Sequence, residues 1–253
     1  MKTPTILKFA ILIALLALPS VLMADTYIRQ AVHQDAVMNN PPNDDTTYTW
    51  MTEGLARSDT RSQAIIVDTK ADKMYILDHA KKTYMELPLE YLGNFEKLIG
   101  IDTMDEQQAA AARQQMQSMK SMMQVHMTIT PTDETSKIKD WNCKKYLMEM
   151  KIGMATVNSE AWVTNDVKMN WTDFWETTNA MMFQMPGADQ VMQELKKMDG
   201  LPVKTTGTAS VMGNEIKTTS EVLEISTKAA PAGTYDLPKD YTKEEFEFGG
   251  GMK

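Results

Sequence analysis

Residues 64–87 read AIIVDTKADKMYILDHAKKTYMEL and contain three short apolar runs of the kind that form β-strands. The runs are Ala64–Val67, Met74–Leu77 and Thr83–Leu87, and short polar links separate them. Strands that follow one another at a spacing of about ten residues, with links of this length, are typical of an antiparallel meander. This stretch therefore predicts neighbouring antiparallel strands in one sheet.

Extended structure is also predicted on both sides of this stretch. Before it, residues 26–53 mix apolar with polar side chains, and the sequence PPNDD at residues 41–45 marks a turn. After it, the ranges predicted to be extended are 125–130, 145–151, 155–164, 203–212 and 215–225. Gly213-Asn214 is a two-residue hairpin signal that joins the last two ranges. The proline-rich residues 231–238 are expected to be irregular.

A helical insert is predicted between the two strand regions. Pro88 opens a short helix that ends at Gly100, and a second helix is predicted from Thr103. Glu106 completes a capping-box pattern at its start, and the helix runs towards residue 123. One face of this helix holds Ala109, Ala112, Met116, Met119 and Met123. The spacing of these side chains predicts an amphipathic helix.

Two further helices are predicted after residue 164. The first begins at Asn170, whose side chain can cap free backbone N–H groups. A shorter helix follows over residues 189–198. One face of the first helix carries aromatic and thioether side chains, namely Trp171, Phe174, Trp175, Met182 and Met185. The sequence therefore predicts an α+β domain in which amphipathic helices interrupt the strand pattern.

The first 24 residues have the layout of a secretory signal peptide. Lys2 and Lys8 precede an apolar run over residues 9–18, and Ala24 is a small residue at the expected cleavage position. The run is too short to cross a bilayer as an ordinary transmembrane helix. We therefore expect residues 25–253 to form a single exported domain, periplasmic or secreted, with a short flexible glycine-rich tail. The residue directly after the expected cleavage position is Asp25 and not a cysteine, so we expect no lipid anchor.

Composition and charge exclude several kinds of partner. The formal net charge of −8 over 253 residues argues against nucleic acid as the main partner, because phosphate binding needs a basic surface. For the same reason, a polybasic attachment to anionic lipid is disfavoured. The single cysteine, Cys143, rules out an intramolecular disulfide and a multi-cysteine metal cluster.

The motifs of the common enzyme classes are absent from the sequence. It contains no Gly-x-Ser-x-Gly elbow, no His-Glu-x-x-His and no phosphate-binding glycine loop. His33, His79 and His126 stand far apart, and Cys143 lacks the context of a nucleophile. We therefore predict a protein that is not an enzyme and that uses no cofactor.

Methionine is the outlier in the composition, with 23 residues. Six lie between Met104 and Met127, and six between Met169 and Met198. Three interpretations stay open. The thioethers can fill an irregular core, or they can form an adaptable surface for apolar ligands. They can also bind Cu(I), because soft ligands three apart can converge on one helix face. The residues of that third interpretation are Met116, Met119, Met122, Met123 and His126.

Several short motifs resemble those of a family of bacterial exported proteins that is known as a domain of unknown function. In chain order they are Ile138-x-Asp140-Trp141-x-Cys143-x-Lys145-Tyr146, Trp162-Val163-Thr164, Gly200-Leu201-Pro202-Val203, Glu221-Val222 and Leu237-Pro238-x-x-Tyr241. Asp140 stands where that family usually has glycine, and Asp240 is a similar departure before Tyr241. The family is similar to the lipoprotein-carrier superfamily with the LolA/LolB-like fold. The resemblance implies a single strongly curved antiparallel sheet, an open half-barrel, covered by several amphipathic helices, whose hollow can receive acyl chains.

The leading hypothesis is a non-catalytic periplasmic binding or carrier protein for a lipid, a lipoprotein acyl chain or another hydrophobic ligand. We expect a monomer that makes transient contact with an envelope membrane. The candidate lining residues are Met116, Met119, Met123, Trp171, Phe174 and Trp175. Each of them can instead belong to an ordinary core between helix and sheet. The alternatives are a methionine-rich Cu(I)-binding periplasmic protein and a structural envelope protein without a ligand.

Overall fold

The computed structural model describes residues 25–36, 41–92, 96, 100, 101, 104–122, 124–153, 155–169, 171, 174, 175, 178, 187–211 and 214–245. The predicted signal peptide and the glycine-rich tail lie outside this part of the chain. The single exported domain predicted over residues 25–253 therefore stays a prediction.

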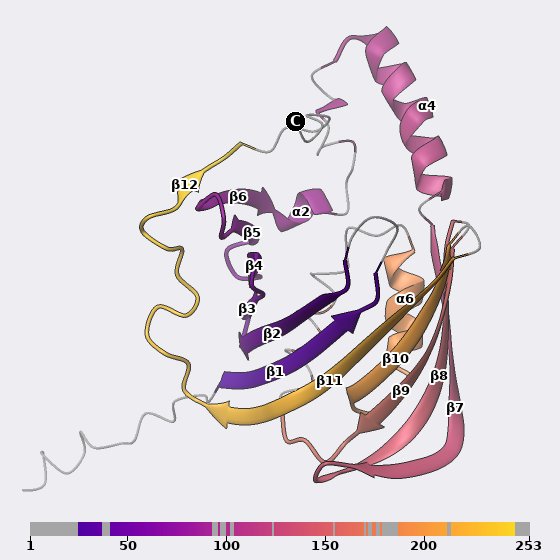
Figure 1. The fold of residues 1–253 in the computed structure, drawn as a ribbon. Coiled ribbons are helices and arrows are strands. Elements are labelled where there is room, and N and C mark those ends of the chain that lie inside the picture. Colours follow the sequence, from indigo (N-terminus) through magenta and orange to yellow (C-terminus); the bar gives the residue numbers. More distant parts are fainter. Residues whose placement is uncertain are drawn as a thin grey trace, which may run out of the picture.

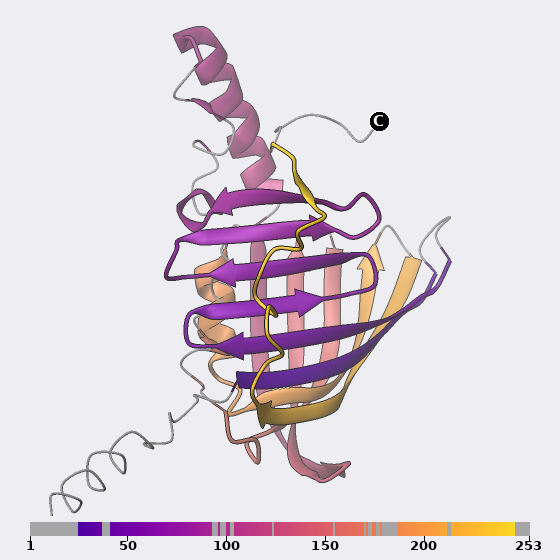
Figure 2. The same ribbon diagram turned by 90° about the vertical axis from the view of Figure 1, so that its left-hand side faces the viewer.

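One sheet of twelve strands forms most of the described structure (Figures 1 and 2). The strands are β1 Asp25–Gln34, β2 Asn43–Thr52, β3 Leu55–Asp59, β4 Gln63–Asp68, β5 Lys73–Asp78, β6 Thr83–Pro88, β7 Val125–Ile138, β8 Trp141–Ile152, β9 Ala155–Thr164, β10 Leu201–Val211, β11 Asn214–Lys228 and β12 Thr242–Lys243. Their order in the sheet is β12-β6-β5-β4-β3-β2-β1-β11-β10-β9-β8-β7.

The sheet consists of two antiparallel meanders, β1–β6 and β7–β11, joined by the pairing of β1 with β11. It curves strongly and does not close, since β6 and β7 lie towards opposite ends of the strand order (Figure 1). The predicted meander and the predicted open, curved sheet are therefore confirmed. Only the short strand β12 departs from the antiparallel pattern among the described strands, because it pairs with β6 in parallel.

One central strand was not predicted. Strand β3, residues Leu55–Asp59, has charged residues at two of its five positions and begins after Gly54, whose φ of 76° makes the turn from β2. The two charged side chains satisfy each other, because Arg57 Nε donates to Asp59 Oδ2 at 2.7 Å. This pairing lets a segment with little apolar character lie in the middle of a meander.

The described helices are α2 Leu89–Leu92, α4 Glu106–Met122 and α6 Ala188–Leu195. The second predicted helix begins later than expected, at Glu106, while Thr103 lies outside the described residues. The carboxylate of Asp105 accepts a hydrogen bond from the backbone N–H of Gln108 at 2.8 Å. Asp105 is therefore the N-cap that fixes the start of α4.

The prediction that several helices cover the sheet is not supported by the described helices. Helix α6 packs against β7, whereas α4 extends beyond the sheet in both views (Figures 1 and 2). The sequence of α4 explains this placement, since it is rich in alanine and glutamine. Ala109 near its start is buried, while Ala110, Ala111 and Arg113 are exposed.

Helix α6 also protects one edge of the sheet. The Gln190 side chain pairs with both backbone groups of Met127 on β7, as a neighbouring strand would. Gln190 Nε2 donates to the Met127 carbonyl at 2.6 Å, and the Met127 N–H donates to Gln190 Oε1 at 2.9 Å. The Ile129 N–H donates to Glu194 Oε2 at 2.9 Å. Because these backbone groups are satisfied, the part of the β7 edge around Met127 and Ile129 is protected from pairing with another chain.

The opposite edge is covered by the end of the chain. Residues 229–241, which we call the C-terminal strap, cross the outer side of the first meander as an irregular segment (yellow in Figure 2). Arg57 Nη1 donates to the Thr234 carbonyl at 3.1 Å, and the Tyr241 hydroxyl lies 2.8 Å from His79 Nδ1. Leu237 and Tyr241 pack on the cluster of Ala64, Ile66 and Leu77. The strap leads into β12, which pairs with β6.

Substitution of Gly187 tests how much the contact between the start of α6 and β7 stabilises the fold. Its φ is 96°, and a Cβ placed on it would lie 2.4 Å from the Val125 carbonyl oxygen of β7. Gly187→Ala should therefore lower the free energy of unfolding by about 3 kcal/mol, which urea titration measures. Gly233→Ala is the matched control, because Gly233 has a φ of 80° and no atom closer than 3.5 Å to such a Cβ. We expect a loss of about 1 kcal/mol there. Equal losses would contradict the close approach.

Candidate ligand-binding face

Side chains on the concave side of the sheet form rows across the strands. Strand pairing places Met51 opposite Ala56, Ala56 opposite Val67, and Val67 opposite Met74. Met74 lies opposite Leu87, and all five residues are buried. We call the side of the sheet that carries this row the inner face. It is the side that the two meanders turn towards each other (Figure 1).

The next row on the inner face is apolar but only half-buried. Ile65 lies opposite Ile76, and Ile76 lies opposite Met85. One row further, Gln63 lies opposite Asp78. The inner face of the first meander therefore changes from a buried apolar row through a half-exposed apolar row to a polar rim. Sequence reasoning named none of these residues as a lining, although the period-two alternation of the strands could have identified them.

Small side chains occupy the middle of the inner face in the second meander. Ser220 lies opposite Thr205, and Thr205 lies opposite Ala161. In the neighbouring row, a Cβ on Gly207 would lie only 2.8 Å from Ser159 Oγ. Ala161 is completely buried in the same cluster as Met198, so the small side chain at this position lets the segment that follows α6 pack closely on the inner face.

Methionines of the strands also gather on the inner face. The first meander contributes Met51, Met74 and Met85, and the second contributes Met127, Met148 and Met150. The last three are half-buried, and Met127 lies directly opposite Met150. Sequence reasoning gave weight to the helical methionines and missed this set, because its members come together only through strand register.

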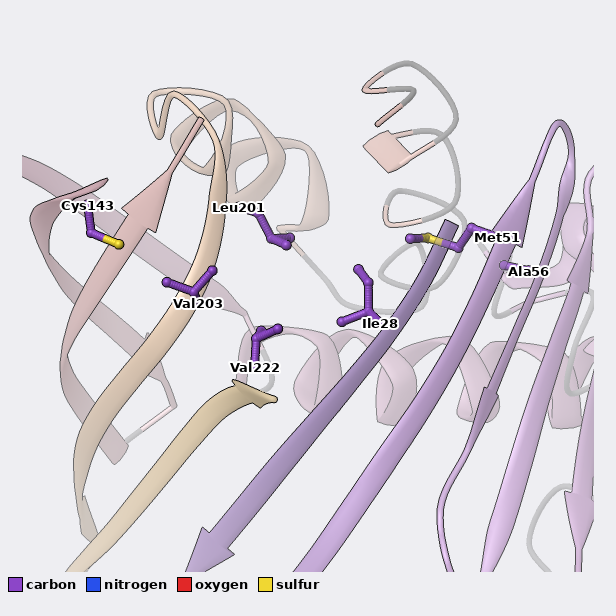
Figure 3. Packing of buried hydrophobic residues seen from close by; sticks show 7 residues of the cluster. All are labelled: Ile28, Met51, Ala56, Cys143, Leu201, Val203 and Val222. Carbon is purple, nitrogen blue, oxygen red and sulfur yellow. The ribbon is translucent and has the colours of Figure 1, made fainter. Parts of the chain in front are cut away.

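Three of the predicted lining residues come together. Trp171, Phe174 and Trp175 are helical and half-buried. The ring centroids of Trp171 and Phe174 are 5.8 Å apart, and those of Phe174 and Trp175 are 5.1 Å apart, both with an edge-to-face geometry. Trp171 and Phe174 pack against a buried cluster of the sheet (Figure 3), made of Ile28, Met51, Ala56, Cys143, Leu201, Val203 and Val222. We call these three rings the aromatic trio.

The methionines predicted to line the same site are placed differently. Met116 and Met119 belong to α4, which extends away from the sheet, and their side chains lie outside what the structure describes. Met123 lies outside the described residues, as does the side chain of Met122. His126 is exposed on β7. The Cu(I) interpretation therefore stays a prediction, and the described residues contain no cluster of three histidine, cysteine or acidic side chains suited to a metal.

The titratable groups of the described residues serve mainly to hold the sheet together. His33 Nδ1 of β1 lies 2.6 Å from Asp44 Oδ1 of β2, and the hydrogen bond to Asp44 is the main reason that the pKa of His33 is raised. His79 connects β5 to the strap through Tyr241. The Cys143 thiol is 3% exposed, and burial raises its pKa. A covered thiol with a raised pKa is a poor nucleophile, which agrees with the missing nucleophile context of Cys143 in the sequence.

Comparison with known proteins adds a family match over most of the chain. The model of the family described as Domain of unknown function (DUF4412) matches residues 44–241. These residues extend from the start of β2 to the end of the strap, and the predicted resemblance to a family of unknown function is therefore confirmed. No curated protein matches the sequence. None of the described helices is long and apolar enough to cross a membrane.

Several solved structures are similar to this chain at low sequence identity. PNGF-II is 12% identical, with a TM-score of 0.39, over 88% of this chain and 31% of its own. The chain thus spans about a third of the length of PNGF-II. A LolA superfamily protein from Nitrosomonas europaea is 8% identical, with a TM-score of 0.32, over 87% of this chain and 92% of its own. A putative outer membrane lipoprotein-sorting protein domain from Vibrio parahaemolyticus is 8% identical, with a TM-score of 0.30, over 85% of this chain and 90% of its own.

Thiol labelling tests the burial of Cys143. At pH 7 a maleimide should react with Cys143 in the folded protein roughly 100-fold more slowly than in urea-unfolded protein, because the thiol is covered and its pKa is raised. The matched control is Ser136→Cys in a Cys143→Ser background, since Ser136 is exposed and lies directly opposite position 143. That control should react at nearly the unfolded rate. Similar rates at the two positions in the folded protein would show that Cys143 is accessible.

Proposed function

The chain belongs to the DUF4412 family of domains of unknown function, and we propose that it is a non-catalytic binding or carrier protein for a lipid, a lipoprotein acyl chain or another apolar ligand. The observation that carries the proposal is the half-exposed apolar row of Ile65, Ile76 and Met85, which lies beside a fully buried row on the inner face. An acyl chain placed along this row would remove its apolar surface from water, at about 25 cal/mol per Å².

The methionines of the inner face favour a ligand of variable shape. Thioether side chains are flexible and polarisable, so they can repack around different apolar groups. Met85 lies on the first meander, while Met127, Met148 and Met150 lie on the second. A ligand on the inner face would therefore meet adaptable side chains on both sides.

The aromatic trio supplies a cover for one part of this face. Trp171 and Phe174 contact the sheet cluster, while Trp175 contacts Phe174. Because these rings are half-buried, part of their apolar surface is available to a ligand. Met116, Met119 and Met123 complete the proposed lining if α4 moves towards the sheet when the ligand binds.

The proposed setting follows from the signal-peptide pattern of residues 1–24 and from the resemblance of the sequence motifs. Cleavage near Ala24 would deliver a single exported domain, residues 25–253, to the periplasm or the medium. The motif resemblance implies the same class of ligand. In this setting the protein would act as a monomer that takes up or delivers its ligand during brief contact with an envelope membrane.

Substitution of one inner-face residue tests the proposed site. Ile76→Ser should weaken the binding of a fluorescent hexadecanoic acid analogue about tenfold, because a half-exposed apolar side chain that the ligand would cover is lost. Leu147→Ser is the matched control, since Leu147 is 44% exposed and lies on the opposite side of the sheet. It should leave the dissociation constant unchanged. Equal effects of the two substitutions would argue against binding at the inner face.

Native mass spectrometry of the protein purified from its own envelope provides a second test. We expect a co-purifying lipid or acyl compound that denaturation releases, because a ligand on the inner face would survive purification. Bound copper would favour the Cu(I) alternative instead. A protein that is empty and also fails to bind the fluorescent analogue would contradict the proposal.

A further inference from the structure

A depression of about 500 Å³ lies beside the hairpin of β7 and β8. Its lining consists of Thr135, Ser136, Lys137, Asn142, Cys143, Lys144, Tyr146, Val163, Asn165 and Asp199. The volume falls within the range of ordinary small-molecule sites, and the lining contains both apolar and polar side chains. The sequence did not indicate this site, because its residues come from the three strands β7, β8 and β9 and from two loops.

The floor of the depression is apolar and connects it to the inner face. Cys143, Tyr146 and Val163 are buried, with at most 5% of each exposed. Cys143 belongs to the cluster of Figure 3, against which Trp171 and Phe174 pack. Tyr146 and Val163 belong to the neighbouring cluster of the second meander. An apolar group that enters the depression therefore meets the side chains on which the proposed ligand face is built.

The wall of the depression carries two lysines without an acidic partner. Lys137 and Lys144 are exposed, and neither forms an ion pair with any residue that the structure describes. Lys144 Nζ lies 5.9 Å from the ring centroid of Tyr146, which directs the ammonium group over the apolar floor. Hydroxyl and amide groups complete the wall, from Thr135, Ser136, Asn142 and Asn165.

Within its lining, the depression has more basic than acidic side chains. Asp199 is the one acidic residue in the lining. Asp166 lies close by, and its Oδ2 accepts hydrogen bonds from the Asn142 backbone N–H at 2.7 Å and from Asn142 Nδ2 at 3.0 Å. Two ammonium groups thus face one carboxylate in the lining, although the chain as a whole carries a net charge of −8.

We propose that this depression binds the anionic head group, a carboxylate or a phosphate, of an amphiphile whose apolar chain lies on the inner face. The inference rests on the proposed function and specifies its ligand class. The two lysines attract the negative charge, while the hydroxyl and amide groups donate hydrogen bonds to its oxygens. Cys143, Tyr146 and Val163 contact the first carbons of the chain. A neutral lipid of the same length lacks the group that the lysines recognise.

Competition against the fluorescent hexadecanoic acid analogue tests the head-group site in the full chain. Hexadecanoate and lysophosphatidic acid should compete about fivefold better than hexadecanol, and this preference should decrease as salt screens the lysines. The double variant Lys137→Gln/Lys144→Gln should lose the preference and still bind hexadecanol like the unaltered protein. The matched control is Lys217→Gln, because Lys217 is exposed on the opposite side of the sheet. It should keep the preference.

The possible results separate this inference from the proposed function. If acid and alcohol compete equally, or if the lysine variant keeps the preference, the protein binds apolar chains but the head-group site is wrong. If the analogue does not bind at all, the proposed function fails and the head-group site fails with it. A preference for hexadecanoate over lysophosphatidic acid, or the reverse, assigns the site to a carboxylate or to a phosphate.

Discussion

The pairing of β1 with β11 is the interaction on which the rest of the structure depends. It joins two meanders that would otherwise be separate sheets, over ten positions from Asp25–Lys228 to Gln34–Thr218. The register shifts between Arg29 and Gln30, so that one extra residue of β11 is left between the paired positions. A bulge increases the local twist and bends the strand. Because the bulge lies at the junction, it turns one meander towards the other and gives the sheet an inner face.

An open sheet of this kind has to protect two edges, and the chain does so by different means. At β7, the Gln190 amide and the Glu194 carboxylate bind backbone groups as a further strand would. At β6, the strap adds the short parallel strand β12. The residues between β6 and β7, including α4, have to connect these opposite ends of the sheet, since the two strands are consecutive in the chain but distant in the strand order. Because β6 and β7 do not pair with each other, the sheet stays open between them.

The sequence predicts those parts of the fold and the site that depend on local periodicity. Strands β4, β5 and β6 have apolar runs and polar links, and Trp171 and Phe174 are three residues apart, which places them on one side of a helix. Strand β3 was not predicted because Arg57 and Asp59 give it little apolar character. Their hydrogen bond to each other forms only in the folded sheet. The position of α4 and the path of the strap depend on contacts between distant residues, such as Arg57 with Thr234. The periodicity of neighbouring residues does not predict contacts between residues this far apart in the sequence.

Strand register also brings methionines from distant parts of the sequence to one face of the sheet. Successive side chains of a strand point to opposite sides of the sheet, and residues that lie opposite each other on paired strands point to the same side. Met127, Met148 and Met150 lie on the same side as Met51 and Met74, although Met127 follows Met74 only after 53 positions in the sequence. A core that is filled uniquely favours side chains with well-defined rotamers, whereas thioethers accept several packings. Met127, Met148 and Met150 are half-buried, so their adaptability suits the ligand that we propose for the inner face.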